Sequence, residues 1–294
     1  MGVKIQTIKD IRFYLARELT GVYKEPEIRA IADILIKTVS GSTKLHQLYD
    51  NGFELVGRDI EKISEFTEKL KTGKPIQYIL GQTTFYNCTI KVNSSVLIPR
   101  PETEELVDLI IRENRGFKGN IIDFGTGSGC IAIALAANLP LAAVTGIEIS
   151  DDALAIAREN AVINKVKISF LKGDIFNPDH NAVGKAGIVV SNPPYVRNSE
   201  KALMGKNVLD FEPPYALFVT DSDPLIYYNA ILKLADKVLL PGGRLYFEIN
   251  EAMGGPMIRL LESFEYSEIE IVTDINDKER IIKGRRKTKV NSKQ

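Results

Sequence analysis

A glycine-rich run in the middle of the chain constrains the fold more than any other feature of the sequence. The run is Asp123-Phe124-Gly125-Thr126-Gly127-Ser128-Gly129-Cys130, and it lies between a short apolar stretch and an alanine-rich segment. Closely spaced glycines at such a junction let the backbone approach a ligand and present free N–H groups at a helix start. We therefore predict a ligand-binding turn between a strand and a helix.

Strands and helices alternate around this run, and their order predicts an α/β fold. Ser150 is placed to cap a helix whose first turn carries Asp151 and Asp152. Such alternation builds a doubly wound, Rossmann-like sheet that binds ligands at the carboxyl ends of its strands. The expected strands are 121–123, 143–149, 166–171, 187–191 and 244–249, and the other expected helices are 102–112, 131–138 and 226–240.

The first part of the chain differs from the rest, so we divide the chain into three segments. Residues 1–74 have apolar side chains at helical spacing and are expected to form a small helical domain, including a short helix from Ser42 through Tyr49. This domain serves either as a docking platform or as a stabilising cap, and the sequence favours neither. The segment 75–99 is expected to be a linking β-hairpin, and 100–294 the α/β domain.

Composition restricts the class of protein. Lys plus Arg equals Asp plus Glu at 38 each, which gives no general support for a nucleic-acid-binding protein. Two cysteines and two isolated histidines provide neither a disulfide framework nor a cluster of metal ligands, so no metal site is expected. No segment resembles a signal peptide or approaches the ~20 apolar residues of a membrane span, so we expect a cytoplasmic protein.

The C-terminal end is basic. After Asp277 the chain holds eight Lys and Arg residues against the single acid Glu279. We favour a solvated, frayed terminus as the explanation. The alternative is an electrostatic guide toward a partner that carries phosphate.

The spacing of the glycines discriminates among ligands. Cys130 stands where the third glycine of a dinucleotide-binding fingerprint belongs, and no lysine follows to make a phosphate-binding Walker loop. Thr126 stands where the Gly-x-Ser-x-Gly elbow of hydrolases needs its first glycine. The next strand ends in Glu148, a carboxylate able to accept the hydroxyls of a ribose. A nucleoside without a pyrophosphate suits these features, and S-adenosylmethionine is such a ligand; a tight turn without any ligand is the alternative.

Two further segments extend the predicted site. Gly173-Asp174-Ile175 follows the third strand, where Asp174 is expected to accept a hydrogen bond from the adenine amino group and Ile175 to cover the ring. The fourth strand runs into Asn192-Pro193-Pro194-Tyr195. Prolines fix φ and remove N–H donors, so the Asn192 side-chain carbonyl and the Pro193 backbone carbonyl are available to accept both hydrogens of a planar amide. Tyr195 is expected to stack on that amide, although a merely rigid turn is the alternative.

This arrangement suits methyl transfer to an amide nitrogen, whose lone pair is delocalised and poorly nucleophilic. Two fixed acceptors favour a pyramidal nitrogen and stabilise the positive charge that develops on it. Alignment of nitrogen, methyl carbon and sulfur is the remaining requirement, with reacting atoms ~3–3.5 Å apart. No general base is expected, because the methylated nitrogen is acidic enough to lose its proton to water.

The glycine run together with Asn192-Pro193-Pro194-Tyr195 is similar to the class I amino-methyltransferases, some of which act on nucleic acid. Further runs resemble the release factor glutamine methyltransferases, the HemK or PrmC family. These runs are Pro75-Ile76-Gln77-Tyr78-Ile79-Leu80-Gly81, Phe85-Tyr86, Leu97-Ile98-Pro99-Arg100-Pro101-Glu102-Thr103-Glu104-Glu105-Leu106-Val107, Glu212-Pro213-Pro214-Tyr215-Ala216-Leu217, Pro241-Gly242-Gly243-Arg244-Leu245 and Glu279-Arg280.

The resemblance implies N5-methylation of the glutamine in the Gly-Gly-Gln loop of peptide chain release factors, with S-adenosylmethionine as donor. It implies that the helical domain contacts the release factor and that Pro101 to Glu105 lies near the cofactor and the substrate entrance. Asn192-Pro193-Pro194-Tyr195 would hold the glutamine, with Asn192, Pro193 and Tyr195 as the catalytic residues. The implied cofactor-binding residues are Gly125, Thr126, Gly127, Ser128, Gly129, Glu148, Ile175 and Asn192, to which the reasoning above adds Asp174.

Three positions depart from the family pattern. Asn87 and Asn250 stand where the family has glycine, and Glu148 stands where Asp is more common. None lies in the Asn-Pro-Pro-Tyr turn, so they concern details rather than the reaction. A nucleic-acid N-methyltransferase and a non-catalytic binding module are the alternatives; the balanced charge disfavours the first and the intact turn disfavours the second. We expect a monomer that needs neither nucleic acid nor a membrane.

Overall fold

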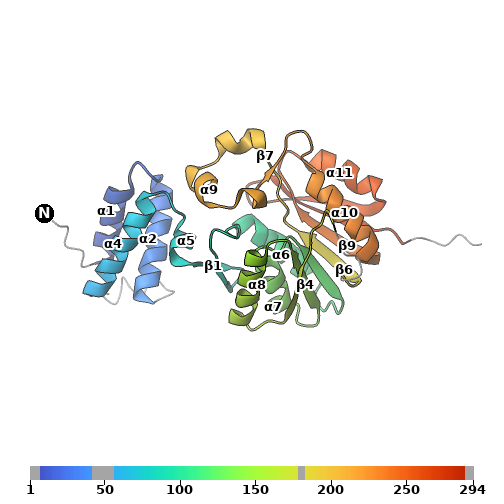
Figure 1. Cartoon of the computed structure of the whole chain (residues 1–294), viewed down its shortest axis with the longest axis horizontal. Helices are drawn as coiled ribbons and strands as arrows, with labels where there is room; N and C mark the ends of the chain where they lie inside the picture. Colours follow the sequence, from blue (N-terminus) through green and yellow to red (C-terminus); the bar gives the residue numbers. More distant parts are fainter. Residues whose placement is uncertain (1–6, 42–55, 178–182, 289–294) are drawn as a thin grey trace, which may run out of the picture. The chain divides into compact units, whose positions relative to one another are not determined.

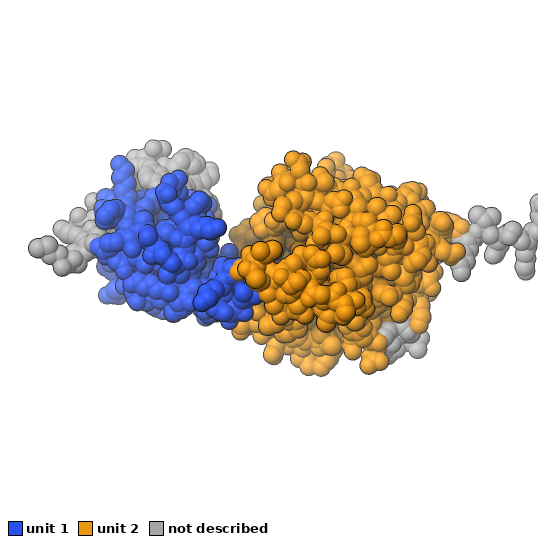
Figure 2. All heavy atoms as spheres, turned by 90° about the horizontal axis from the view of Figure 1, so that it is seen from above, with its two compact units in different colours: residues 1–80, 205–211 blue, residues 81–204, 212–294 orange. Residues whose placement is uncertain are grey.

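The chain divides into two compact units, which Figure 2 shows in different colours. One unit comprises residues 1–80 with 205–211, and the other comprises 81–204 with 212–294. The computed structural model describes residues 7–41, 56–177 and 183–288. The helix expected from Ser42 to Tyr49 lies outside the described residues. Among those that are described, no helix is both long and apolar enough to cross a membrane.

The first unit is a bundle of helices, as its apolar spacing predicts. Its first helix begins at a capping box, in which Thr7 Oγ accepts from the Asp10 N–H at 3.3 Å and the Asp10 carboxylate accepts from the Thr7 N–H at 2.8 Å. Buried side chains such as Ile11 and Leu35 form a shared core. The helices are α1 (Ile8–Leu19), α2 (Glu25–Ser40), α4 (Gly57–Lys71), α5 (Ile76–Leu80) and α9 (Lys206–Phe211).

The helix α5 replaces part of the expected hairpin. The Pro75 carbonyl accepts hydrogen bonds from the N–H groups of Tyr78 and Ile79 at 3.0 and 3.1 Å. The prediction of strand for Tyr78 and Ile79 is therefore wrong. Proline suits the start of a helix because its missing N–H would have no partner there. This local signal outweighs the strand preference of Tyr and Ile, which depends on packing context.

The hairpin itself is shorter than expected. It consists of β1 (Gln82–Phe85) and β2 (Cys88–Lys91), joined by a turn at Tyr86 and Asn87 with φ of 44° and 63°. Positive φ at both positions is typical of a two-residue type I′ turn, and Asn adopts this backbone conformation more readily than most residues. Asn87 therefore fits where relatives would carry glycine. The strand expected at 96–98 is absent, since this segment forms part of a loop instead.

The second unit is built on a seven-stranded sheet with the strand order β10-β11-β9-β6-β3-β4-β5. Five strands are parallel, and β11 runs antiparallel to both of its neighbours. The order reverses at β3, so the crevice beyond β3 and β6 is where such a fold binds ligands. The strands are β3 (Asn120–Phe124), β4 (Ala143–Glu148), β5 (Ile168–Lys172), β6 (Ala186–Ser191), β9 (Leu239–Glu248), β10 (Tyr266–Thr273) and β11 (Glu279–Arg286).

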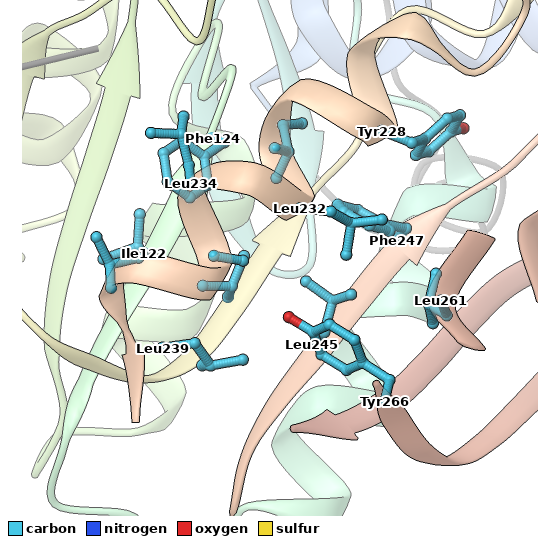
Figure 3. Close-up of a cluster of buried hydrophobic side chains, with 14 of the residues drawn as sticks. Ile122, Phe124, Tyr228, Leu232, Leu234, Leu239, Leu245, Phe247, Leu261 and Tyr266 are labelled. Atoms are coloured by element: carbon cyan, nitrogen blue, oxygen red, sulfur yellow. The ribbon is translucent and has the colours of Figure 1, made fainter. Parts of the chain in front are cut away.

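Helices flank this sheet (Figure 1) and confirm the α/β prediction. The helices α10 and α11 share a buried apolar cluster with the sheet, in which Tyr228 meets Phe247 edge to face at 5.2 Å (Figure 3). The Tyr228 hydroxyl donates to the Glu248 carbonyl at 2.8 Å, so the ring is buried without an unpaired polar group. The helices are α6 (Pro101–Glu113), α7 (Cys130–Asn138), α8 (Asp151–Ile163), α10 (Ile226–Val238) and α11 (Gly254–Ser263).

The basic C-terminal segment is not frayed where it is described. β11 occupies an internal position in the sheet, so the expectation of a solvated terminus is wrong for 279–286. Ile281 and Ile282 are buried, and the basic side chains before and after them are paired with acids. These pairs join Arg280 to Asp274 at 3.2 Å, Lys283 to Glu270 at 2.9 Å, Arg285 to Glu268 at 3.3 Å and Arg286 to Asp236 at 2.8 Å.

Candidate active site

A cavity of about 320 Å³ lies at the carboxyl ends of β3, β4 and β6 in the second unit. Apolar side chains dominate its lining and a few polar groups converge on it, which is typical of a small-molecule site. Most of the predicted site residues meet here. Those that line the cavity are Gly125, Thr126, Gly127, Ser128, Glu148, Asp174, Ile175, Asn192, Pro193 and Pro194, whereas Gly129 and Tyr195 are not among the lining residues.

The glycine run turns sharply out of β3 into α7. Gly125, Gly127 and Gly129 have φ of 69°, 54° and 81°, in a region that side chains disfavour. Gly129 stands at the N-cap of α7, where an added Cβ would lie only 3.2 Å from the side chains of Ala157 and Ile133. Gly125 and Gly127 shape the cavity wall, and Gly129 allows α7 to pack closely.

Glu148 ends β4 beside this loop. Its Oε2 accepts from the Gly127 N–H at 2.9 Å, and its Oε1 accepts from the N–H groups of Ile149 and Ser150 at 2.8 and 3.0 Å. A carboxylate has about four acceptor positions, so one remains for a hydroxyl group. These contacts hold the carboxylate in the cavity wall and tie it directly to the glycine loop.

Asp123 is a further acidic residue at this loop, which the sequence analysis did not assign to the site. It is fully buried; its Oδ2 accepts from the Thr126 hydroxyl at 2.6 Å, and its Oδ1 has no hydrogen-bond partner among the described residues. Burial raises the pKa of Asp123 to about 7, with the hydrogen bond from Thr126 opposing and the nearby Glu148 adding to the shift. A buried carboxylate oxygen without a partner is costly. Asp123 itself is not among the residues that line the cavity.

The third strand contributes a flat, largely apolar wall. Asp174 and Ile175 both line the cavity, and Asp174 Oδ1 accepts from the Phe176 N–H at 2.8 Å. The rings of Phe176 and Tyr227 pack edge to face with their centroids 5.3 Å apart, and both residues line the cavity. No sequence motif points to these two aromatic residues, and Tyr227 lies within the helix α10.

The turn after β6 forms another part of the cavity lining. The Ser191 hydroxyl donates to the Phe124 carbonyl at 2.6 Å, which joins the end of β6 to the glycine loop. Asn192 then donates from its side-chain nitrogen to Thr103 Oγ at 3.1 Å. Asn192, Pro193 and Pro194 all line the cavity. The predicted amide-binding turn and the predicted nucleoside-binding loop therefore face one common space.

Tyr195 makes two contacts that the sequence did not indicate. Its hydroxyl donates to Glu248 Oε1 at 2.9 Å, and its ring packs against the apolar cluster that contains Phe247. Burial raises the pKa of Tyr195 well above its ordinary value, and the neighbouring Glu248 carboxylate adds to the shift. Asn250, at one of the departures from the family pattern, donates to the Tyr195 carbonyl at 3.3 Å and to Glu200 at 2.9 Å. Stacking of Tyr195 on a substrate amide stays a prediction.

Two runs that carried the family resemblance meet at the mouth of the cavity. The carboxylate of Glu212 accepts from Arg100 at 2.6 Å and from the Ile98 N–H at 3.2 Å, and it is almost completely buried. The Tyr215 hydroxyl donates to the Ser95 carbonyl at 2.8 Å. Ser95, Arg100 and Tyr215 all line the cavity. These contacts explain why two runs far apart in the sequence belong to one site.

Known proteins share the fold and the sequence pattern of the unit that contains this cavity. A family model described as the methyltransferase small domain matches residues 102–210. The crystal structure of a methyltransferase from Pyrococcus furiosus shares the fold with a TM-score of 0.51 at 16% identity, and the match covers 67% of this chain and 88% of that chain. The fold is therefore that of the class I methyltransferases, and the family model is that of a methyltransferase domain.

Two relatives identify the family within this class. The release factor glutamine methyltransferase of Flavobacterium psychrophilum is 42% identical over 280 residues, which are 94% of this chain and 98% of that protein. The protein of the same name from Bacteroides thetaiotaomicron is 41% identical over 276 residues, which are 94% of this chain and 99% of that protein. The chain belongs to the release factor glutamine methyltransferase family, which confirms the resemblance seen in the sequence.

Proposed function

We propose that this enzyme transfers a methyl group from S-adenosylmethionine to the side-chain amide nitrogen of the glutamine in the Gly-Gly-Gln loop of peptide chain release factors. The observation that carries the proposal is the convergence of two sets of residues on one cavity. Asn192, Pro193 and Pro194 line this cavity together with the glycine loop and Glu148. The reaction requires a donor site and an amide site that share one space.

The cavity residues fit S-adenosylmethionine by charge and by shape. Glu148 has an acceptor position for a ribose hydroxyl, and Ile175 offers an apolar surface for adenine beside Asp174. Asp123 lies next to the lining residues Phe124 and Gly125 without lining the cavity itself, and it has an unpaired buried oxygen; the ammonium group of the methionine part is proposed to reach this oxygen when the cofactor binds. S-adenosylmethionine supplies a methyl group that its sulfonium already activates.

The enzyme's own residues then act on the glutamine. The Asn192 side-chain oxygen and the Pro193 carbonyl accept the two amide hydrogens and hold the nitrogen in line with the methyl group. Their dipoles stabilise the positive charge that develops on nitrogen, and fixed dipoles do this without reorganising. The methylated nitrogen loses its proton to water, so the site needs no histidine. Tyr195 supports this turn, and its ring is proposed to pack against the glutamine side chain.

The first unit is proposed to dock the release factor. It is a compact unit with its own core of buried residues, which suits a part of the chain that presents a surface to a protein partner. The enzyme is proposed to act in the cytoplasm as a monomer, where release factors are found, without needing nucleic acid or a membrane.

The experiment is methyl transfer from labelled S-adenosylmethionine to a purified release factor. Label is expected in the release factor and not in a variant whose loop glutamine is replaced by alanine. Equal label in the alanine variant would refute the assigned acceptor. Label in added DNA or RNA, with none in the release factor, would favour a nucleic-acid N-methyltransferase instead.

A further inference from the structure

Two buried polar residues adjoin the Asn-Pro-Pro turn and have no function assigned so far: Thr103, which lines the cavity, and Glu248, which does not. Thr103 lies in the first turn of α6 and Glu248 at the end of β9, with exposed fractions of 2% and 1%. They are 145 residues apart in the sequence, yet the Thr103 hydroxyl donates to Glu248 Oε2 at 2.6 Å. Buried polar groups of this kind are retained where they fix a geometry.

The hydrogen bonds run in one direction from Asn192 to Glu248. Burial raises the pKa of Glu248, and the hydrogen bonds from Thr103 and Tyr195 oppose this shift. An ionised Glu248 can only accept, so the single hydroxyl proton of Thr103 is committed to it. The Thr103 oxygen is then left as an acceptor toward Asn192, 3.1 Å away. An acceptor at that position requires the NH₂ end of the Asn192 amide. The Asn192 oxygen must therefore point away from Thr103.

We propose that Thr103 and Glu248 are positioning residues that orient the Asn192 amide, so that its oxygen and not its nitrogen is presented to the substrate amide. This inference rests on the proposed function, because it explains how Asn192 is kept as a hydrogen-bond acceptor. An Asn amide has two nearly isosteric orientations, and only one of them accepts a hydrogen from glutamine. Without a fixed partner, a fraction of the enzyme would present the wrong end.

Glu248 holds the turn at its other end as well. Its Oε1 accepts from the Tyr195 hydroxyl at 2.9 Å, so a single carboxylate connects to the first and the last residue of Asn192-Pro193-Pro194-Tyr195. The connection to Asn192 passes through Thr103, and the connection to Tyr195 is direct. The same carboxylate thus sets both the polarity of Asn192 and the position of Tyr195.

The test uses full-length enzyme with a release factor as substrate. In Glu248→Gln the new amide can donate to Thr103, which frees the Thr103 hydroxyl to donate to Asn192 and turns the Asn192 amide around. We expect kcat to fall at least about tenfold, while the Kd for S-adenosylmethionine stays within about twofold. Thr103→Val should likewise lower kcat and leave the Kd for S-adenosylmethionine unchanged. Thr103→Ser should keep most of the wild-type kcat because it keeps the hydroxyl.

A reversed Asn192 amide should also change which release factor the enzyme binds. A release factor whose loop glutamine is replaced by glutamate presents a carboxylate, which the acceptors of the wild-type site repel. The Glu248→Gln variant, with an Asn192 N–H facing the cavity, is expected to bind this release factor more tightly than the wild type does. A general loss of packing would not produce a gain in affinity.

Glu113→Gln is the matched control. Its carboxylate also accepts from a tyrosine, Tyr246 at 2.8 Å, and pairs with Lys283, but it does not line the cavity. It is expected to keep full activity. A wild-type kcat in Thr103→Val would overturn the positioning role, and so would a low kcat in Thr103→Ser. If Glu248→Gln does not fold, the comparison of Thr103→Val with Thr103→Ser still tests the proposal. An inactive wild type would instead refute the proposed function.

Discussion

The Thr126 hydroxyl donates to one carboxylate oxygen of Asp123 at 2.6 Å, and the other oxygen of Asp123 is buried with no hydrogen-bond partner among the described residues. The turn of the glycine loop brings the two residues together, three positions apart in the sequence. A half-satisfied buried carboxylate costs stability, and such strain is commonly found where a ligand supplies the missing contact. We therefore expect this pair to link the stability of the free enzyme to cofactor binding.

Asp123→Asn should stabilise the enzyme at neutral and alkaline pH in the absence of the cofactor. The folded-state pKa of Asp123 is raised from 3.8 to about 7, so the folded state binds the proton more tightly than the unfolded state. The wild type should therefore lose stability as pH rises from about 4 to about 7, by up to roughly 4 kcal/mol, whereas the variant should not. Thermal unfolding at several pH values measures this difference.

The same substitution should weaken cofactor binding. An amide cannot neutralise the ammonium group that we propose beside Asp123, and a hydrogen bond to a charged group contributes about 1.5–3 kcal/mol. Calorimetric titration of S-adenosylmethionine at pH 8 should show a loss of affinity of about tenfold or more. Unchanged affinity would exclude Asp123 from the cofactor site, whatever the effect on stability.

Asn192→Ala should reduce turnover much more than cofactor affinity. The substitution removes one of the two proposed acceptors at the developing charge, a change that costs about 10²–10³ in kcat in comparable sites. Single-turnover kinetics with a release factor measures the loss, and titration of S-adenosylmethionine provides the control. Activity equal to that of the wild type would falsify the role given to Asn192.

Glu148→Ala should chiefly affect the cofactor. Three backbone N–H groups of the glycine loop and the β4–α8 turn lose their acceptor, and so does the proposed ribose hydroxyl. We expect the affinity for S-adenosylmethionine to fall by about 10- to 100-fold, since each hydrogen bond to a charged group is worth about 1.5–3 kcal/mol. At saturating cofactor, kcat should recover toward the wild-type value. A kcat that stays low would assign Glu148 to the chemistry instead.

Two C-terminal truncations should show that the strand β11 is needed for folding and that the residues after Thr288 are not. Truncation after Thr288 leaves β11 intact and should preserve the melting temperature and activity. Truncation after Asp277 removes β11, which lies between β9 and β10, and should abolish folding because the sheet would lose an internal strand. Circular dichroism distinguishes the two outcomes. A folded, active product of the shorter chain would contradict the internal position of β11.

The parallel part of the sheet could be predicted from the sequence because its signals are local. Apolar strands such as β3 and β6 end at the glycine loop and at Asn192, where the chemistry of the residues changes within one or two positions. Parallel strands bring such ends to one edge of the sheet, so the cavity follows from the order of the elements. The strand β11 could not be predicted in this way, since its basic residues indicated a solvated tail while acids on other elements pair with them.

Contacts between residues far apart in the sequence explain why other parts of the site could not be predicted. Thr103 and Glu248 meet across 145 residues, and Tyr195 turns its hydroxyl toward the same carboxylate. The motif around Asn192 gives no indication of either partner. The α5 helix shows the opposite case, because a local proline signal outweighed the strand preference of Tyr78 and Ile79.

The most direct measurement is tandem mass spectrometry of a release factor incubated with the enzyme and S-adenosylmethionine. The account predicts a mass increase of one methylene unit on the side-chain amide of the Gly-Gly-Gln glutamine, absent from the reaction with Asn192→Ala over the same time. Methylation at a backbone nitrogen, at another residue, or at equal rate without Asn192 would contradict it.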